Sequence, residues 1–496
     1  MSGLGTRLQV ILGIIAVVVI AAAAGGIVYA SRGSDEHRAG GTPTSGQAGS
    51  DAHPSVPAPG PGRRGATARP TKPTKPRSTL PPLPPTPTPV LRSYAGTGPM
   101  PTGPGVIAAV GSALQDSSLG DRVAAEVVDL STGKQLYGHR ATALATPASV
   151  TKIATAAAAL MTFGPEHRFT TKVVAGTPPG TVVIVGGGDP TLSAVGIAGT
   201  EPSYPGAARV TTLATQAKLA ASGPIRRIVV DGTLYSGARS GPGWDSDDIS
   251  GGDVGRITAL TVDGGRQKAG WKPRAANPDL LTGRDVAIAL GAPRLPVTRG
   301  KAPAGARVLA QVQSPPLGQI TETMLAVSDN TLAETLGHNV AAERGRPATF
   351  VNAGAAVRDV LAEHGVPTAG IRLTDTSGLS RDDRLSPAAL TAILRAAASP
   401  SNPHAHLLFS QLPVAGYSGT LAHRYREGAQ SAAAGEVRAK TGTLSSVITL
   451  AGIVQDADGR YLAFALLADN VSGQNLSGAR YALDEVAARL AGCGCR

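Results

Sequence analysis

The feature that most limits how this chain can fold is a proline-rich stretch that ends near residue 104. Six of the nine residues from Pro81 to Pro89 are proline, and threonine and glycine are frequent on both sides. Proline lacks a backbone N–H and fixes φ, so such a stretch stays extended and cannot bury an apolar core. We therefore assign residues 33–104 to a linker and expect the folded part to begin at residue 105.

An apolar run without charges precedes this linker, at residues 10–30. Its sequence is VILGIIAVVVIAAAAGGIVYA, and it lies between Arg7 and Arg32. The run is long enough to span a membrane and longer than an ordinary signal-peptide core, although Val28–Ala30 resembles a cleavage site. We expect residues 1–32 to form a membrane anchor, with a cleaved signal segment as the alternative. Either form places the rest of the chain outside the cytoplasm, anchored to the cell membrane or released into the cell-wall space.

The formal net charge of +12 is concentrated in the N-terminal tail. Residues 1–95 contain ten Lys and Arg residues but only three acidic residues. Aromatic residues make up 3% of the chain and do not alternate with these charges, so nucleic-acid bases would find no stacking surface. We therefore expect no nucleic-acid partner. A solvated basic tail, or loose attraction to an anionic membrane or wall polymer, accounts for the charge.

Cysteine and histidine are too sparse for a metal centre. The two cysteines, Cys493 and Cys495, lie at the extreme C-terminus, and the nine histidines are scattered. Two cysteines cannot form a disulfide framework or a four-cysteine zinc site. A local disulfide and a cross-link between chains both stay open. The sequence predicts no metal and no cofactor.

The folded part divides into three stretches. Residues 105–169 show a helix at 107–115, strands at 123–130 and 134–139, and a long helix from Pro147 that Thr146 is placed to cap. Residues 170–313 alternate short Val/Ile runs with Gly and Pro, which indicates a separate, strand-rich insertion. The elements expected in residues 314–496 are helices at 317–327, 330–343 and 475–491, strands at 436–440, 447–454 and 461–468, and a hairpin turn at Asp456–Gly459.

Two Ser-x-x-Lys patterns occur in different surroundings. Ser131 to Lys134 falls in a turn between two predicted strands, so we set it aside. Ser149 and Lys152 fall at the start of the Pro147 helix, where residues i and i+3 share a face. A desolvated lysine can lose its charge and act as the base that a serine hydroxyl needs. A chance serine beside a surface lysine is the alternative for this pattern taken alone.

Two further motifs follow along the chain. They are Ser328-Asp329-Asn330 and Lys440-Thr441-Gly442-Thr443. The first lies between two predicted helices, where it can carry side chains into a cleft or simply cap the second helix. The second lies on a predicted strand, where glycine would let a substrate backbone approach and Lys and Thr could bind a carboxylate. An exposed strand end is the alternative for the second.

The ordered set of Ser-x-x-Lys, Ser-x-Asn and Lys-Thr-Gly is typical of active-site serine penicillin-binding proteins and β-lactamases. The long stretch between the first two motifs resembles the D-alanyl-D-alanine carboxypeptidase/endopeptidase family, the low-molecular-mass class C penicillin-binding proteins. The likeness runs from about residue 105 to 490. It is carried by Pro147-Ala148-Ser149, Gly186–Leu192, Gly243–Asp248, Asp375–Arg381 and Leu412–Leu421. The chain departs from the family pattern at Val150 and Thr376, neither of which is a catalytic side chain.

This resemblance implies an α/β (α+β) fold. A β-lactamase/transpeptidase-like serine hydrolase domain, with an antiparallel sheet flanked by helices, would be interrupted by the inserted domain. The domain would act as a serine-type D-Ala-D-Ala carboxypeptidase on peptidoglycan stem peptides, with β-lactams as covalent inhibitors. Additional endopeptidase activity stays open.

The resemblance also implies roles for eight residues. The catalytic ones are Ser149, Lys152, Ser328 and Lys440, and the substrate-binding ones are Asn330, Thr441, Gly442 and Thr443. Ser149 would attack the carbonyl of the penultimate D-Ala, Lys152 would take its proton, and Ser328 with Lys440 would relay a proton to the leaving amine. Asn330 would hold the peptide amide, and the two threonine hydroxyls would bind the terminal carboxylate. Backbone N–H groups of the nucleophile and of the second threonine would form the oxyanion hole.

Two other functions are considered. A β-lactamase would need a base and a water placed for rapid deacylation, which the sequence does not reveal, and the long insertion argues against it. A non-catalytic β-lactam sensor or wall-binding protein is argued against by the intact pair Ser149 and Lys152.

Overall fold

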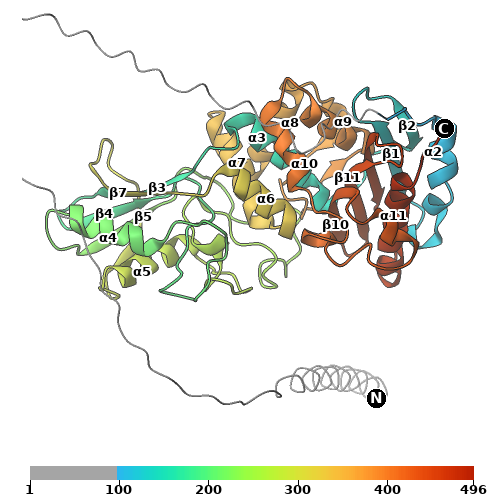
Figure 1. Ribbon diagram of the computed structural model, residues 1–496. Coiled ribbons are helices and arrows are strands. Elements are labelled where there is room, and N and C mark those ends of the chain that lie inside the picture. The colour runs from blue at the N-terminus through green and yellow to red at the C-terminus, as the bar shows by residue number, and fades with distance from the viewer. Residues whose placement is uncertain (1–97) are drawn as a thin grey trace, which may run out of the picture. The chain divides into compact units, whose positions relative to one another are not determined.

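The structure, a computed structural model, describes residues 98–496 (Figure 1). The predicted anchor at residues 1–32 and most of the predicted linker lie outside the described residues. Within residues 98–496 no helix is both long enough and apolar enough to cross a membrane. The first helix, α2 (Gly103–Val110), begins two residues before residue 105, the predicted start of the folded part. The Thr102 hydroxyl accepts a hydrogen bond from Gly105 N at 3.1 Å.

A five-stranded antiparallel sheet carries the third motif. Its spatial order is β10-β11-β12-β1-β2. The strands are β1 (Val123–Asp129), β2 (Gln135–His139), β10 (Val437–Leu444), β11 (Val447–Gln455) and β12 (Tyr461–Ala468). The hairpin predicted at Asp456–Gly459 is confirmed, since it joins β11 to β12. Strand β10 lies at the sheet edge and runs four residues beyond its predicted end, because its pairing with β11 continues to Leu444.

Helices cover both faces of this sheet (Figure 1). On one face, α2 and α11 (Leu476–Ala491) share a core with Leu450 and Phe464 of the sheet. On the other face, α3 (Thr151–Phe163) and α9 (Pro387–Ala398) share a core with Ile453 and Ala465. Successive strand residues point to opposite faces, so strands buried on both sides are continuous apolar runs. The remaining elements of this part are α6 (Leu317–Val327), α7 (Asn330–Glu343), α8 (Phe350–Glu363), α10 (Leu407–Gln411), β8 (Ile371–Arg372) and β9 (Arg384–Leu385).

A second five-stranded sheet lies within residues 170–313. Its order is β6-β5-β4-β3-β7, with β5 parallel to both β4 and β6 and the other pairs antiparallel. Its elements are β3 (Thr170–Ala175), β4 (Thr181–Val185), α4 (Val210–Ala220), β5 (Arg227–Asp231), α5 (Pro278–Ala289), β6 (Val297–Arg299) and β7 (Val308–Gln313). The two helices pack on the sheet and bury its core. A strand-bearing insertion between the first two motifs is therefore present.

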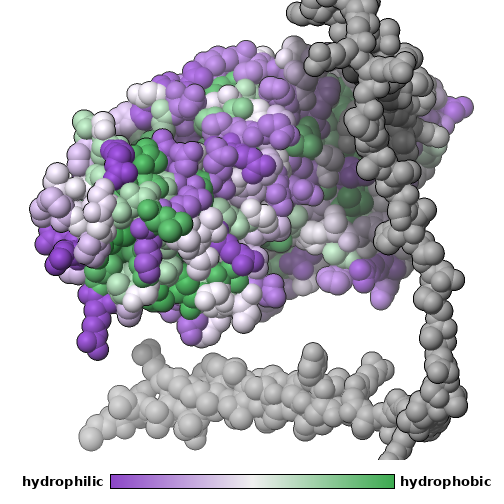
Figure 2. Space-filling model, turned by 60° about the vertical axis from the view of Figure 1, so that its left-hand side comes forward, coloured by the Kyte–Doolittle hydropathy of each residue, from purple (hydrophilic) through white to green (hydrophobic). Residues whose placement is uncertain are grey.

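The inserted region also exposes apolar side chains. Leu219 on α4, Ile288 on α5 and Val308 on β7 are all exposed. Figure 2, in which this region comes forward, shows apolar residues (green) gathered among hydrophilic ones on its surface. Part of the apolar surface of this region therefore remains in contact with solvent.

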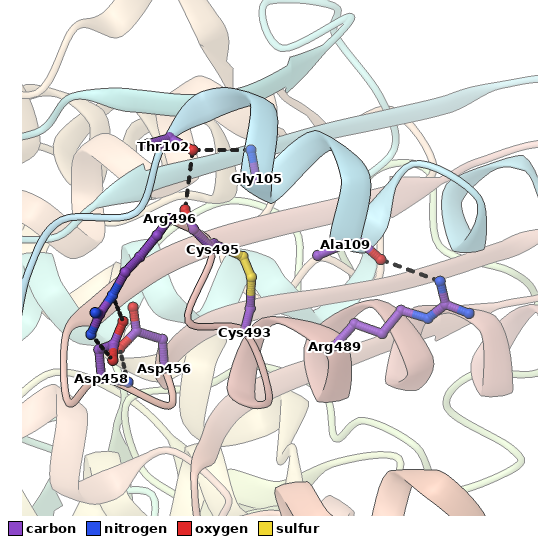
Figure 3. Close-up of a disulfide and its surroundings, with 9 residues drawn as sticks. All are labelled: Thr102, Gly105, Ala109, Asp456, Asp458, Arg489, Cys493, Cys495 and Arg496. Atoms are coloured by element: carbon purple, nitrogen blue, oxygen red, sulfur yellow. Dashed lines mark hydrogen bonds and ion pairs between the residues drawn. A yellow bond between two sulfur atoms is a disulfide. The ribbon is translucent and has the colours of Figure 1, made fainter.

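The C-terminal segment is tied to the start of the folded part. Cys493 and Cys495 form a disulfide, which decides between the two states left open for them (Figure 3). The Cys495 carbonyl oxygen accepts hydrogen bonds from Thr102 N at 2.7 Å and from the Thr102 hydroxyl at 3.1 Å. Arg496 forms an ion pair with Asp458 in the β11–β12 turn, at 2.7 Å. The two ends of the described chain therefore meet beside this turn.

Two predicted helices are present but differ in their bounds, and the predicted Thr146 cap is wrong. The helix expected from Pro147 consists of a 3₁₀ turn, η3 (Ala148–Val150), followed by α3, and Thr146 caps neither. The Thr146 hydroxyl instead accepts a hydrogen bond from Arg384 Nη1 at 3.2 Å. The helix expected at 107–115 ends at Val110 and is followed by a separate 3₁₀ turn.

Candidate active site

The predicted nucleophile and base meet at the start of α3. Ser149 lies in the 3₁₀ turn η3 and Lys152 in the first turn of α3. The Lys152 side chain is fully buried, and its Nζ donates to Ser149 Oγ at 2.8 Å. A 3₁₀ turn brings residues i and i+3 into line, so the predicted contact forms although Ser149 precedes the α-helix.

Lys152 makes two further hydrogen bonds. Its Nζ donates to Asn330 Oδ1 at 2.6 Å and to the Ser377 carbonyl oxygen at 2.7 Å. These contacts match the three donors of an ammonium group. Asn330 Nδ2 donates to the Asp253 carbonyl oxygen, in the inserted region, at 3.2 Å. Without substrate, the oxygen and the nitrogen of the Asn330 amide therefore both form hydrogen bonds within the protein.

The Ser328–Asn330 motif forms the junction between α6 and α7. Ser328 ends α6 in the left-handed conformation, with φ of 58°. Asp329 caps α7 by accepting from Leu332 N at 3.0 Å, and it forms an ion pair with Arg266 of the inserted region at 3.4 Å. The capping interpretation is therefore confirmed for Asp329. Asn330 contacts Lys152, and the catalytic role of the motif stays a prediction.

The Lys-Thr-Gly motif lies on edge strand β10. Lys440 is fully buried, and within residues 98–496 its Nζ donates to the Thr441 carbonyl oxygen at 2.8 Å rather than to Ser328. The Thr441 hydroxyl donates to the Thr420 hydroxyl at 2.9 Å. A Cβ at Gly442 would lie 2.9 Å from the Pro147 carbonyl oxygen, so this glycine lets β10 approach η3. The prediction that Gly442 makes room for substrate is wrong, because protein atoms fill that space.

A cleft of about 450 Å³ opens beside the nucleophile. Four predicted residues line it, namely Ser149, Ser328, Asn330 and Thr443. The other four predicted residues, Lys152, Lys440, Thr441 and Gly442, are not part of its lining. The inserted region contributes charged residues to the lining, namely Asp248, Asp253, Arg266 and Arg274. Sequence reasoning missed the two arginines, since no local pattern separates them from surface arginines.

The two buried lysines differ in their electrostatic surroundings. Burial lowers the pKa of Lys152 to about 8, against an opposing effect of nearby carboxylates, chiefly Asp375 and Glu334. Burial, and then the charge of Lys152, hold the pKa of Lys440 well below its ordinary value. The sequence led us to expect that desolvation helps Lys152 to lose its charge. Its pKa does fall, but the nearby carboxylates limit the decrease to about 8.

Two buried carboxylates hold the segment that contacts Lys152. Glu334 accepts from Ser377 N at 2.8 Å, and Asp375 accepts from the same N–H at 3.0 Å and from Trp244 Nε1 at 2.8 Å. Burial, and then the charge of Asp375, raise the pKa of Glu334 to about 8. Sequence reasoning missed both roles. The available signal was that Glu334 follows Asn330 by four residues and so shares its helix face.

Comparison with known proteins identifies the family. Residues 106–285 and 273–490 match the D-Ala-D-Ala carboxypeptidase 3 (S13) family. The chain belongs to this family. It is 42% identical over 420 residues to a carboxypeptidase from Mycobacterium tuberculosis, covering 84% of this chain and 90% of that one. It is 41% identical over 425 residues to carboxypeptidase DacB from Mycolicibacterium smegmatis, with the same two coverages.

A solved relative of this S13 chain shares its fold. Penicillin-binding protein 4 from Haemophilus influenzae superposes with a TM-score of 0.63 at 21% identity, covering 77% of this chain and 98% of that protein. A second structure of that protein, with a TM-score of 0.57, contains a β-lactam. The predicted serine hydrolase fold with an additional sheet domain is confirmed. By family, the chain is a serine-type D-Ala-D-Ala carboxypeptidase.

Proposed function

We propose that this S13-family carboxypeptidase removes the terminal D-Ala from peptidoglycan stem peptides through an acyl-enzyme formed on Ser149. The observation that carries the proposal is the 2.8 Å hydrogen bond between Lys152 Nζ and Ser149 Oγ at the wall of the cleft. A buried amine beside a hydroxyl can take up its proton, and the hydroxyl oxygen then becomes a nucleophile.

Acylation follows from this arrangement. Ser149 Oγ bonds to the carbonyl carbon of the penultimate D-Ala, and its proton passes to the neutral form of Lys152. The C–N bond then breaks, and the amine of the terminal D-Ala takes a proton relayed by Ser328 and Lys440. The lowered pKa of Lys440 suits it to accept and pass on protons. Water later cleaves the ester and restores the Ser149 hydroxyl.

Substrate binding requires small rearrangements. Thr443 is exposed in the cleft, so its hydroxyl can bind the terminal carboxylate directly. The Thr441 hydroxyl must turn from Thr420, and the Asn330 amide must give up one of its protein contacts to hold the peptide. Arg274 in the cleft wall donates to two backbone oxygens and can also attract the terminal carboxylate, although Asp248 and Asp253 line the same cleft.

The decisive experiment compares two serines of the same pattern. Ser149→Ala is expected to lose labelling by fluorescent penicillin and to lower D-Ala release by about 10³-fold to 10⁶-fold, as for loss of a catalytic nucleophile. Ser131→Ala, in the other Ser-x-x-Lys, serves as the control and is expected to keep both activities. Labelling that persists in Ser149→Ala would disprove the assignment.

The lifetime of the penicillin label tests the two alternatives. A carboxypeptidase of this mechanism holds the penicilloyl group for long periods, whereas a β-lactamase releases it rapidly. A sensor holds the label but does not release D-Ala from peptides. Stable labelling together with D-Ala release is the outcome expected for this chain.

We further propose that residues 10–30 anchor the enzyme to the cell membrane on its outer side. Support comes from the uncharged apolar sequence alone, which lies outside the described residues.

A further inference from the structure

A second cavity lies at the junction between the inserted sheet and α7. Its volume, about 450 Å³, equals that of the Ser149 cleft, and the two share no lining residue within 98–496. Its wall contains Val230 of β5, Arg299 of β6, Asp279 of α5, His338 of α7 and the loop segment 232–239 except Leu234. A cavity of this size can hold a ligand of several linked chemical groups.

The cavity has an excess of positive charge. Arg239, Arg299 and Lys301 line it together with a single carboxylate, Asp279. Arg239 Nη2 and Arg299 Nε bind Asp279 at 3.0 and 2.6 Å, so one carboxylate is shared by two guanidinium groups. Lys301 is exposed and makes no ion pair within residues 98–496. Asp231 is buried nearby but does not line the cavity.

Neutral polar groups complete the lining. The exposed residues Thr233 and Ser236 bring hydroxyl groups, and the rings of Tyr235 and His338 lie 5.0 Å apart. His338 is buried, and its Nδ1 lies 2.8 Å from the Glu334 carbonyl oxygen, so Nδ1 carries the proton. The other nitrogen, Nε2, has no hydrogen-bond partner in the described part of the chain and can accept an N–H or O–H from a ligand.

We propose that this cavity is a second, non-catalytic binding site for a carboxylate-bearing segment of a peptidoglycan stem peptide, an inference that rests on the proposed function. Lys301 binds the carboxylate with its ammonium group. The guanidinium groups of Arg239 and Arg299, which each donate two hydrogen bonds to Asp279, add longer-range attraction. His338 Nε2 accepts from a peptide N–H. A small inorganic anion would leave most of the volume empty. His338 lies eight residues along α7 from Asn330, about 12 Å at 1.5 Å per residue, so one wall polymer can contact both sites.

The test uses the full-length protein with its cleft blocked. Ser149 is acylated with penicillin, and mass spectrometry confirms the label. A stem peptide that lacks both terminal D-Ala residues but keeps its free carboxylates is then titrated by calorimetry. Lys301→Glu is expected to weaken its binding at least 10-fold, and Ser236→Trp, which fills the cavity, is expected to weaken it similarly. Lys218→Glu, an equal charge change on exposed α4, is the control and is expected to bind like the parent. All variants should be acylated by penicillin at the parental rate.

The outcomes separate this proposal from the proposed catalytic function. Absence of the penicillin label would contradict the role of Ser149, and the titration would then be run on Ser149→Ala. Failure of the peptide to bind, or equal binding by Lys301→Glu and the parent, would overturn the second site. Inorganic phosphate that competes as strongly as the peptide would also overturn it, by showing a site for small ions.

Discussion

Two effects shift the pKa of Lys152 in opposite directions. Burial lowers its pKa, whereas Asp375, Glu334 and Asp329 raise it, and the result is about 8. Only the neutral amine has a lone pair for the Ser149 proton, so the reactive form is a minority at pH 7 and a majority above pH 8. Burial and the opposing carboxylates together therefore set the pH range in which the nucleophile is activated.

The first prediction concerns the pH dependence of acylation by penicillin. For the parent enzyme, the rate should rise with pH through about 8, because deprotonation of Lys152 creates the base. Lys152→Arg keeps a positive charge but cannot lose it, so acylation should be very slow from pH 6 to 10. Lys440→Arg, the matched change at the other buried lysine, should be less damaging. Near-parental acylation by Lys152→Arg would mean that another group is the base.

The second prediction treats Asp375 as a positioning residue. Asp375→Asn removes the charge that most raises the pKa of Lys152, so the acidic limb of the acylation profile should move to lower pH. The maximal rate should also fall, because Asp375 holds Ser377 and Trp244. Asp382→Asn, an exposed neighbour, is the control and should leave the limb in place. A lower rate with an unmoved limb would assign Asp375 a structural role only.

Helix α7 carries residues that act in the catalytic cleft and in the second cavity. Asn330, Glu334 and His338 are spaced four residues apart, so they lie on one face of this helix. Asn330 binds Lys152, Glu334 holds Ser377, and His338 lines the second cavity. One helix therefore positions groups for the catalytic cleft and for the proposed second site.

The turn η3 depends on close packing against two neighbours. A Cβ at Gly442 of β10 would lie 3.0 Å from Ala148 Cβ in η3, and one at Gly378 would lie 1.9 Å from the Ala148 carbonyl oxygen. Gly378 also has φ of 78°, which disfavours other residues. These two glycines allow the strand and the Asp375 segment to meet the turn that carries Ser149.

The third prediction follows from this packing. Gly442→Ala should displace β10 from η3, destabilise the fold by about 1–3 kcal/mol as overpacking does, and slow acylation of Ser149. Gly473→Ala, where no atom lies within 4 Å of the added Cβ, should change neither property. Urea unfolding and penicillin acylation measure the two effects. Parental acylation by Gly442→Ala would show that η3 does not depend on this contact.

For the whole molecule, the described fold begins with α2 rather than with the proline-rich stretch. Val106 and Val110 of α2 are fully buried in the core that contains α11, and Thr102 binds the Cys495 carbonyl oxygen. The start and the end of the described chain therefore stabilise each other.

The fourth prediction concerns truncation. A protein that lacks residues 1–97 should be soluble, folded and active on soluble peptides, because it keeps α2 and Thr102. A protein that lacks residues 1–110 should be markedly less stable, because it loses the buried side chains of α2. Thermal unfolding and D-Ala release compare the two. If the protein that lacks residues 1–97 is folded but inactive, the tail takes part in catalysis.

The sequence by itself determined the three motifs, their order, and the helical junction and strand that carry the second and third. Ser149 and Lys152 are close in sequence, and the Ser328 junction and the Lys440 strand are bounded by strong helix and strand patterns, so local physics suffices to place them. The pair of helices at 317–327 and 330–343 was predicted with the bounds that the structure has.

Only the tertiary structure decided how these motifs act together. Whether Lys152 is neutral depends on carboxylates at positions 329, 334 and 375, which folding brings close. What Gly442 faces depends on the packing of β10 against a turn almost 300 residues earlier in the chain. Arg266 and Arg274 enter the cleft from the inserted region, far along the chain from Ser149. Local periodicity does not record such contacts, because electrostatic and packing energies depend on distances in space and not on separation along the sequence.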